Sequence, residues 1–135
     1  MNRLVIDSSL YVAFANPLDE HFLDSQLFLE NLVSKGQLLT PRLVVIEVIN
    51  VLNRLKVKEV DLIESVFRGG ELVELDERVQ EVIMGILPQV KLKSLDLIIV
   101  ATAKLYEAQL VSWDKKLVRE ANKVVKAYTP VGGGR

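Results

Sequence analysis

The sequence predicts an α/β protein in which one parallel sheet is covered by helices on both faces. Two observations lead to this fold class. Short apolar runs such as Leu4–Ile6 alternate along the chain with longer segments in which apolar residues recur at helical spacing. Runs that are apolar at consecutive positions are typical of parallel strands buried on both faces. With 135 residues, half of them hydrophobic, the chain has the length of one compact domain.

Five short strands are expected, each bounded by a turn or by the start of a helix: 4–6, 37–39, 71–75, 109–111 and 124–128. Helices are expected in the remaining segments: 8–14, 19–35, 41–55, 57–67, 77–87, 94–108 and 115–122. Residues 1–129 would form a single domain, and the glycine-rich residues 130–135 a flexible tail.

Capping residues indicate where several of these helices begin. Asp7-Ser8-Ser9 follows the first strand directly and is expected to cap the first helix. Thr40 and Pro41 are expected as the N-cap and the first helical residue of the third helix. Asp76 and Asp114 are expected to cap two later helices in the same way.

The composition narrows the possible chemistry. There are no cysteines and only one histidine, His21, which excludes disulfides and thiolate metal sites and disfavours a histidine cage or a Ser-His-Asp triad. The net charge of −1 means that nucleic-acid binding would need a local basic patch. We find no signal-peptide pattern and no apolar run long enough to cross a bilayer, so a cytoplasmic protein without membrane contact is expected.

Two aspartates are placed where ligands bind in open parallel sheets. Asp7 follows the first expected strand and Asp114 lies just after the fourth. Ligands of such sheets bind beyond the carboxyl ends of the strands. For either residue alone, a simple helix cap is the favoured interpretation.

Glu47 lies on a segment, 43–52, that is apolar on nearly every side, so it is expected to be largely buried. A buried carboxylate is unfavourable by several kcal/mol, in rough terms, unless it is paired or binds a cation. Asn50 and Arg54 lie one and two turns further on, forming a polar stripe with Glu47. An internal Glu47–Arg54 salt bridge and a functional site explain the stripe equally well.

Asp96 is a single acid at the start of an apolar helix, where the helix dipole favours an anion. Capping alone would explain it. Together with Asp7, Glu47 and Asp114, however, it makes a set of acids that would repel one another unless a hard cation neutralised them. Oxygen ligands select Mg²⁺ or Mn²⁺ over zinc. Such an ion beside a phosphodiester activates water and stabilises charge on the leaving oxygen.

The sequence resembles the PIN-domain family, and within it the VapC-type toxins. The resemblance covers nearly the whole chain and is carried by four motifs in order: Val5-Ile6-Asp7-Ser8-Ser9, Glu47-Val48-Ile49-Asn50-Val51-Leu52, Leu95-Asp96-Leu97-Ile98 and Val111-Ser112-Trp113-Asp114-Lys115-Lys116-Leu117. It implies a five-stranded parallel sheet of order 3-2-1-4-5, which would bring the first and fourth strands together. It also implies that the four acids are the catalytic residues and hold Mg²⁺ or Mn²⁺.

Further residues are expected to shape the site or to contact the substrate. By the resemblance, Ser112 matches a site-shaping hydroxyl two residues before the last acid, and Asn50 the polar residue one turn after the glutamate. Ser8 and Arg54 are grouped with them. Lys115 and Lys116 would meet RNA phosphates beside the metal, or would simply lie on a solvated helix face. Trp113 is expected in the core, although stacking on a base is the alternative.

The leading hypothesis is a metal-dependent endoribonuclease that acts as the toxin of a toxin–antitoxin pair. Its partners would be an RNA substrate and a small antitoxin protein. The alternatives are a housekeeping PIN nuclease for RNA maturation and a non-catalytic PIN module that binds RNA or protein. The high apolar share and the apolar face of residues 19–35 also predict a homodimer.

Overall fold

The computed structural model describes residues 2–58 and 60–130, without the side chains of residues 33–36, 60 and 62. Five parallel strands form one sheet in the order β3-β2-β1-β4-β5, as the sequence predicts. The strands are β1 (Asn2–Ile6), β2 (Gly36–Pro41), β3 (Glu71–Val73), β4 (Gln109–Val111) and β5 (Ala127–Tyr128). β1 lies in the middle of the sheet, and its Val5 and Ile6 are completely buried.

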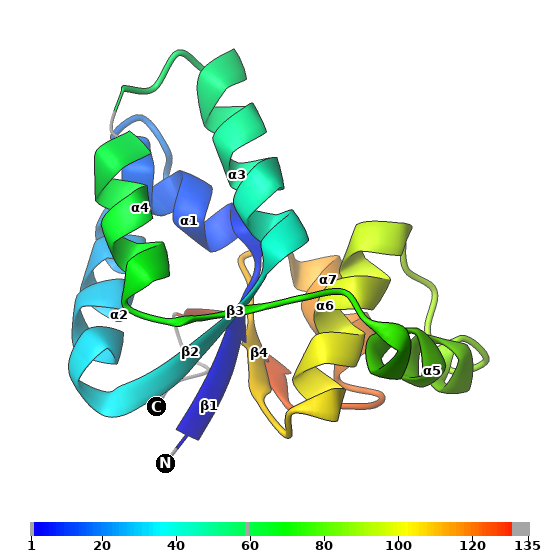
Figure 1. Ribbon diagram of the computed structural model, residues 1–135. Coiled ribbons are helices and arrows are strands. Elements are labelled where there is room, and N and C mark those ends of the chain that lie inside the picture. The colour runs from blue at the N-terminus through cyan, green and yellow to red at the C-terminus, as the bar shows by residue number, and fades with distance from the viewer. Residues whose placement is uncertain (1, 59, 131–135) are drawn as a thin grey trace.

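Helices cover both faces of the sheet, so the predicted α/β architecture is confirmed. The helices are α1 (Ser8–Ala15), α2 (Phe22–Lys35), α3 (Arg42–Arg54), α4 (Val60–Arg68), α5 (Glu77–Ile86), α6 (Ser94–Leu105) and α7 (Lys115–Ala121). Figure 1 shows α1, α2 and α4 on one side of the sheet and α5 and α6 on the other, while α3 extends away from the end of β2. None of the described helices is long and apolar enough to cross a membrane.

Two helices end earlier than the sequence predicts, and both do so through a non-glycine residue in the left-handed conformation. Lys56 has φ 57° and Glu107 has φ 54°. After each, a backbone N–H reaches back five residues, from Val57 to Leu52 O at 3.0 Å and from Ala108 to Ala103 O at 2.8 Å. This is the hydrogen-bond pattern that usually relies on glycine, so the sequence carries no signal for it. Residues 57 and 58 are therefore not helical, and α6 stops at Leu105.

The expected cap at Thr40 is wrong. Thr40 is the fifth residue of β2, is fully buried, and its hydroxyl is 3.1 Å from the Tyr11 hydroxyl. Pro41 is the N-cap residue and the helix begins at Arg42. The buried tyrosine hydroxyl needs a hydrogen-bond partner, and Thr40 supplies it across the sheet–helix interface.

Other element ends differ by a few residues. α2 begins at Phe22 rather than at residue 19, because Asp19 Oδ1 accepts the His21 N–H (2.8 Å) in a local turn. β3 ends at Val73 and β5 is limited to Ala127–Tyr128. Most of the expected flexible tail, residues 131–135, lies outside the described residues.

Candidate active site

Asp7 lies at the carboxyl end of the central strand, in a buried position. Its backbone N–H donates to Val111 O (3.0 Å), which joins the end of β1 to the end of β4. Although Asp7 is the N-cap residue of α1, its carboxylate makes no capping hydrogen bond in the described structure. Instead its Oδ2 accepts the Ser112 hydroxyl at 2.7 Å. The expected capping role is therefore wrong for this side chain, whose other oxygen, Oδ1, lies 3.5 Å from the Ser8 hydroxyl.

Ser112 connects two of the predicted acids. Its hydroxyl is fully buried, donates to Asp7 and accepts the Asp114 backbone N–H at 2.9 Å. Since its one proton is used on Asp7, the Ser9 hydroxyl at 3.3 Å must be the donor in the Ser9–Ser112 pair. Ser9 in turn accepts the Trp113 backbone N–H at 3.1 Å. Sequence reasoning missed this use of Ser9, because its partners are more than 100 positions away in the chain.

Asp114 caps a helix and also lies at the end of β4. Its Oδ1 caps α7 by accepting the backbone N–H groups of Lys116 (3.0 Å) and Leu117 (3.2 Å), which confirms the predicted cap. The residue is also exposed beside the end of β4, next to Asp7. Lys115 and Lys116 follow it as exposed residues in the first turn of α7.

Asp96 lies in the first turn of α6, and its pKa is raised to about 6. Burial is the largest cause, followed by the negative charges of Asp7, Asp114 and Glu47; the positive charge of Lys93 partly opposes them. Burial and like charges both disfavour the ionised form. Asp7, Glu47 and Asp114 therefore all lie within electrostatic reach of Asp96, although the four acids come from four different parts of the chain.

Glu47 is half-buried, not largely buried as expected. α3 extends beyond the sheet, so only Val44, Val48 and Leu52 are buried on it. Ile46 is 58% exposed and Ile49 is 42% exposed. The apolar pattern of this helix reflects one buried face and one exposed apolar face.

The alternative explanation for the polar stripe, an internal salt bridge, is wrong. Asn50 and Arg54 are exposed. Among the described residues, no ion pair links Arg54 to Glu47. Glu47 instead belongs to the same electrostatic neighbourhood as Asp96.

A hollow of about 640 Å³ opens beside these acids, and Ser8, Glu47 and Asp114 line it together with Trp113 and His21. A second hollow, about 870 Å³, lies between α3 and α6 and is mostly apolar.

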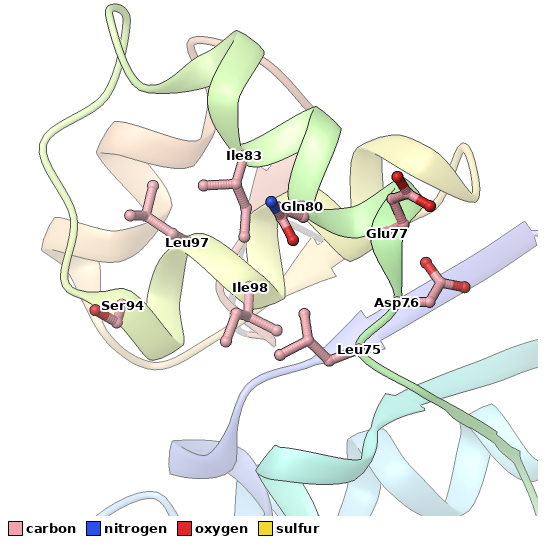
Figure 2. A pocket seen from close by; sticks show the side chains of 8 residues that line it. All are labelled: Leu75, Asp76, Glu77, Gln80, Ile83, Ser94, Leu97 and Ile98. Carbon is pink, nitrogen blue, oxygen red and sulfur yellow. The ribbon is translucent and has the colours of Figure 1, made fainter.

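Figure 2 shows a third hollow, between α5 and α6, where Asp76 and Glu77 lie at one end of a group of apolar side chains. The Asp76 carboxylate there already caps α5 and pairs with Arg78 at 2.8 Å.

The donor set suits a hard divalent cation. Carboxylate oxygens with a neighbouring serine hydroxyl are the ligand types of Mg²⁺ and Mn²⁺. In the described part of the chain, however, no three acidic or histidine side chains are drawn together as closely as metal ligands are. The fit therefore lies in the chemistry and the neighbourhood of the four acids rather than in a preformed cage.

A comparison of the sequence with models of protein families agrees with this strand order and with the acids near the carboxyl edge. The family model for the PIN domain matches residues 4–123. The chain belongs to the PIN-domain family. A sequence comparison with curated proteins gives no match.

Several solved structures that resemble this PIN domain are described as toxins or toxin–antitoxin complexes. A toxin–antitoxin complex from Klebsiella pneumoniae matches with a TM-score of 0.73 and 17% identity, covering 94% of this chain and 97% of that one. VapBC2 from Rickettsia felis, bound to a DNA fragment from its promoter, gives 0.70 and 16%, covering 94% and 98%. VapC20 from Mycobacterium tuberculosis, a toxin that cleaves the sarcin–ricin loop, gives 0.67 and 14%, covering 86% and 93%. These likenesses show a shared fold.

Proposed function

We propose that this PIN domain is a metal-dependent endoribonuclease and the toxin of a toxin–antitoxin pair. The observation that carries the proposal is the gathering of Asp7, Glu47, Asp96 and Asp114 around the carboxyl edge of β1 and β4. A local structural need does not explain this gathering, because burial and, after it, the neighbouring acids raise the pKa of Asp96 and so destabilise its charged form. The likeness to an RNA-cleaving toxin supports RNA as the substrate.

The four acids would hold Mg²⁺ or Mn²⁺, and the ion would supply an activated water and charge stabilisation at the phosphate. The chain's own residues prepare this site. Ser112 orients the Asp7 carboxylate through the 2.7 Å hydrogen bond and holds the Asp114 backbone in place. Such hydrogen bonds to metal ligands typically change affinity or activity by about 10- to 100-fold.

The exposed cations near the acids are proposed to bind the RNA backbone. Lys115 and Lys116 follow Asp114 directly, and Arg54 lies on the same helix as Glu47 without an ion-pair partner among the described residues. Each would neutralise part of the phosphate charge. Ser8 lines the hollow beside the acids, and Asn50 lines the second hollow, between α3 and α6. Both are therefore positioned to contact the substrate.

The groove between α3 and α6 supports the proposal of an antitoxin. Two of the residues that line it, Ile46 and Ile49, are large, apolar and exposed. Glu47 lines this groove as well as the hollow beside the acids. An apolar groove beside an active site suits a small protein that blocks the site when it binds. A housekeeping nuclease would share the acids but would bind no such inhibitor.

We also propose that the protein forms a homodimer. The predicted apolar face of α2 has only part of its residues in the core, and Leu23 (69%) and Leu27 (60%) remain exposed. A dimer would remove such side chains from water. A monomeric mass in light scattering at micromolar concentration would contradict this proposal.

The function is tested by RNA cleavage with the purified chain in Mn²⁺, in Mg²⁺ and in excess EDTA. We expect cleavage only with the metals, and its loss in Asp7→Asn, which keeps the shape of the side chain and removes its charge. Asp76→Asn is the matched control, because Asp76 also follows a strand and precedes a helix. Normal cleavage by Asp7→Asn would refute the proposed site.

A further inference from the structure

The hollow beside the acids has an aromatic wall made of His21 and Trp113. Their rings are stacked, with centroids 3.8 Å apart and planes within 6° of parallel. His21 comes from the turn before α2, whereas Trp113 lies between β4 and α7. Both residues line the same hollow as Glu47 and Asp114. The wall therefore lies immediately beside the proposed site of phosphodiester cleavage.

Hydrogen bonds at two points hold Trp113 in place. Its indole Nε1 donates to the hydroxyl of the fully buried Ser25 at 2.7 Å, and its backbone N–H donates to Ser9 at 3.1 Å. Through Ser9 and Ser112 this second contact continues to Asp7. A chain of hydrogen bonds thus connects the aromatic wall to Asp7. The expected core position of Trp113 is confirmed in part: the residue is half-buried and packs against the core, with its ring stacked on His21.

The charges around the wall indicate which part of a nucleotide fits there. Asp19 and Glu20 line the hollow as well, in addition to Glu47 and Asp114. Carboxylates repel a phosphate but accept hydrogen bonds from N–H groups on the edge of a base. The Glu20 carboxylate lies 3.4 Å from His21 Nε2, but the Glu20 side chain keeps 84% of its surface exposed and that of His21 keeps 34%. Stacking surface and hydrogen-bond acceptors are therefore both accessible from the hollow.

We propose that this hollow is a subsite for one unpaired nucleobase next to the cleaved phosphate, with the His21–Trp113 pair as its stacking surface. The proposal rests on the proposed function and adds the substrate element that the enzyme recognises. Unpaired bases are typically bound by stacking on aromatic rings together with hydrogen bonds to their edges. Guanine is expected to bind best, because its N1–H and N2–H₂ donors lie side by side and match one carboxylate.

Trp113 is the only tryptophan of the chain, so intrinsic fluorescence reports on this subsite directly. In EDTA, without cleavage, we expect guanosine monophosphate to quench the fluorescence to saturation, uridine monophosphate more weakly, and ribose 5-phosphate hardly at all. His21→Ala should weaken guanosine monophosphate binding by about tenfold, since stacking contributes roughly 1–3 kcal/mol per base. His21→Phe keeps an aromatic ring and should retain most of the binding. Glu20→Gln should reduce the preference for guanine.

The outcomes separate a base subsite from a purely structural stack and from failure of the nuclease proposal. If His21→Ala melts at a lower temperature but binds guanosine monophosphate like the parent, the stack is structural and the proposal is overturned. Equal quenching by ribose 5-phosphate also overturns it, since the hollow then binds phosphate. If the parent binds the nucleotide but does not cleave RNA with Mn²⁺, the result supports the base subsite and contradicts the proposed nuclease function.

Cleavage of an RNA with a single abasic position provides a second test. Moving the abasic position along the cleaved sequence should raise KM strongly at one position beside the cut, and this increase should disappear in His21→Ala. A KM that is independent of the abasic position would overturn the subsite and leave the nuclease function in place.

Discussion

Asp76 and Asp7 occupy the same local position, after a parallel strand and before a helix, but their surroundings are opposite. Asp76 Oδ1 accepts two backbone N–H groups of α5, and Oδ2 pairs with Arg78 at 2.8 Å. Its pKa is lowered, chiefly by the side-chain hydrogen bond from Arg78. Asp7 is buried, caps nothing, and contributes to raising the pKa of Asp96.

A strand followed by an aspartate therefore does not by itself predict the role of the carboxylate. At the β3–α5 junction the aspartate's charge is compensated locally and stabilises the fold. At the β1–α1 junction the described structure brings other acids and Ser112 instead. Uncompensated charge of this kind is typical of functional sites, where stability is given up for activity.

The largest expected effect is on activity and separates the two junctions. Asp7→Asn should lower RNA cleavage by about 100-fold or more, since it removes a proposed metal ligand. Without metal, it should be as stable as the parent or more stable, because one repelling charge is lost. Asp76→Asn should show the reverse, normal cleavage with a lower melting temperature. Cleavage assays measure the activity of each variant, and thermal melts in EDTA measure its stability. Equal melting temperatures for Asp76→Asn and the parent would contradict the stabilising role of Asp76.

Metal binding should stabilise the parent and the Asp76→Asn variant but not Asp7→Asn. An ion at about 100 times its dissociation constant adds about 2.7 kcal/mol to the free energy of unfolding. The measurement is the melting temperature with and without millimolar Mn²⁺. If the parent melts identically in both conditions, the four acids are not a metal site.

A smaller effect is expected from the hydroxyl that orients Asp7. Ser112→Ala removes the 2.7 Å hydrogen bond to Oδ2 and should lower kcat/KM by about 10- to 100-fold. Ser65→Ala is a control, since Ser65 is exposed and its hydroxyl donates to a backbone carbonyl of the same helix, Asp61 O, at 3.2 Å. Loss of activity should exceed loss of thermal stability in Ser112→Ala. The opposite order would make Ser112 a purely structural residue.

The smallest expected effect is on the pH dependence of stability, and its sign differs between Asp96 and Asp76. The folded protein holds the Asp96 proton up to about pH 6, whereas an unfolded aspartate releases it near pH 4. Between these values the folded state binds more protons, so metal-free stability from this group falls as pH rises. Asp76, with its lowered pKa, contributes stability above its ordinary pKa that is lost as pH falls through its folded pKa.

Melting temperatures in EDTA from pH 3 to 7 should therefore diverge between the parent and Asp96→Asn as pH rises from about 4 to about 6, the variant becoming relatively more stable. The difference between the parent and Asp76→Asn should shrink on the acid side. Parallel curves for the parent and Asp96→Asn across this range would mean that Asp96 titrates alike in the folded and unfolded states.

The sequence alone determined the alternation of strands and helices, because buried parallel strands need apolar residues at consecutive positions. It also determined the caps at Asp76 and Asp114, whose hydrogen bonds reach only two or three residues along the chain. The resemblance to PIN domains correctly predicted the strand order. It also directed attention to four acids, of which Asp7, Glu47 and Asp114 lie within electrostatic reach of Asp96.

Tertiary structure decided the features that depend on distant partners. Thr40 does not cap, because it bonds to Tyr11, and Glu47 is half-exposed, because α3 extends beyond the sheet. The Ser9–Ser112 pair and the His21–Trp113 stack join residues about 90 to 100 positions apart. Periodicity and capping rules describe interactions within a few residues of one another, so they predict the elements and leave such contacts to the folded structure.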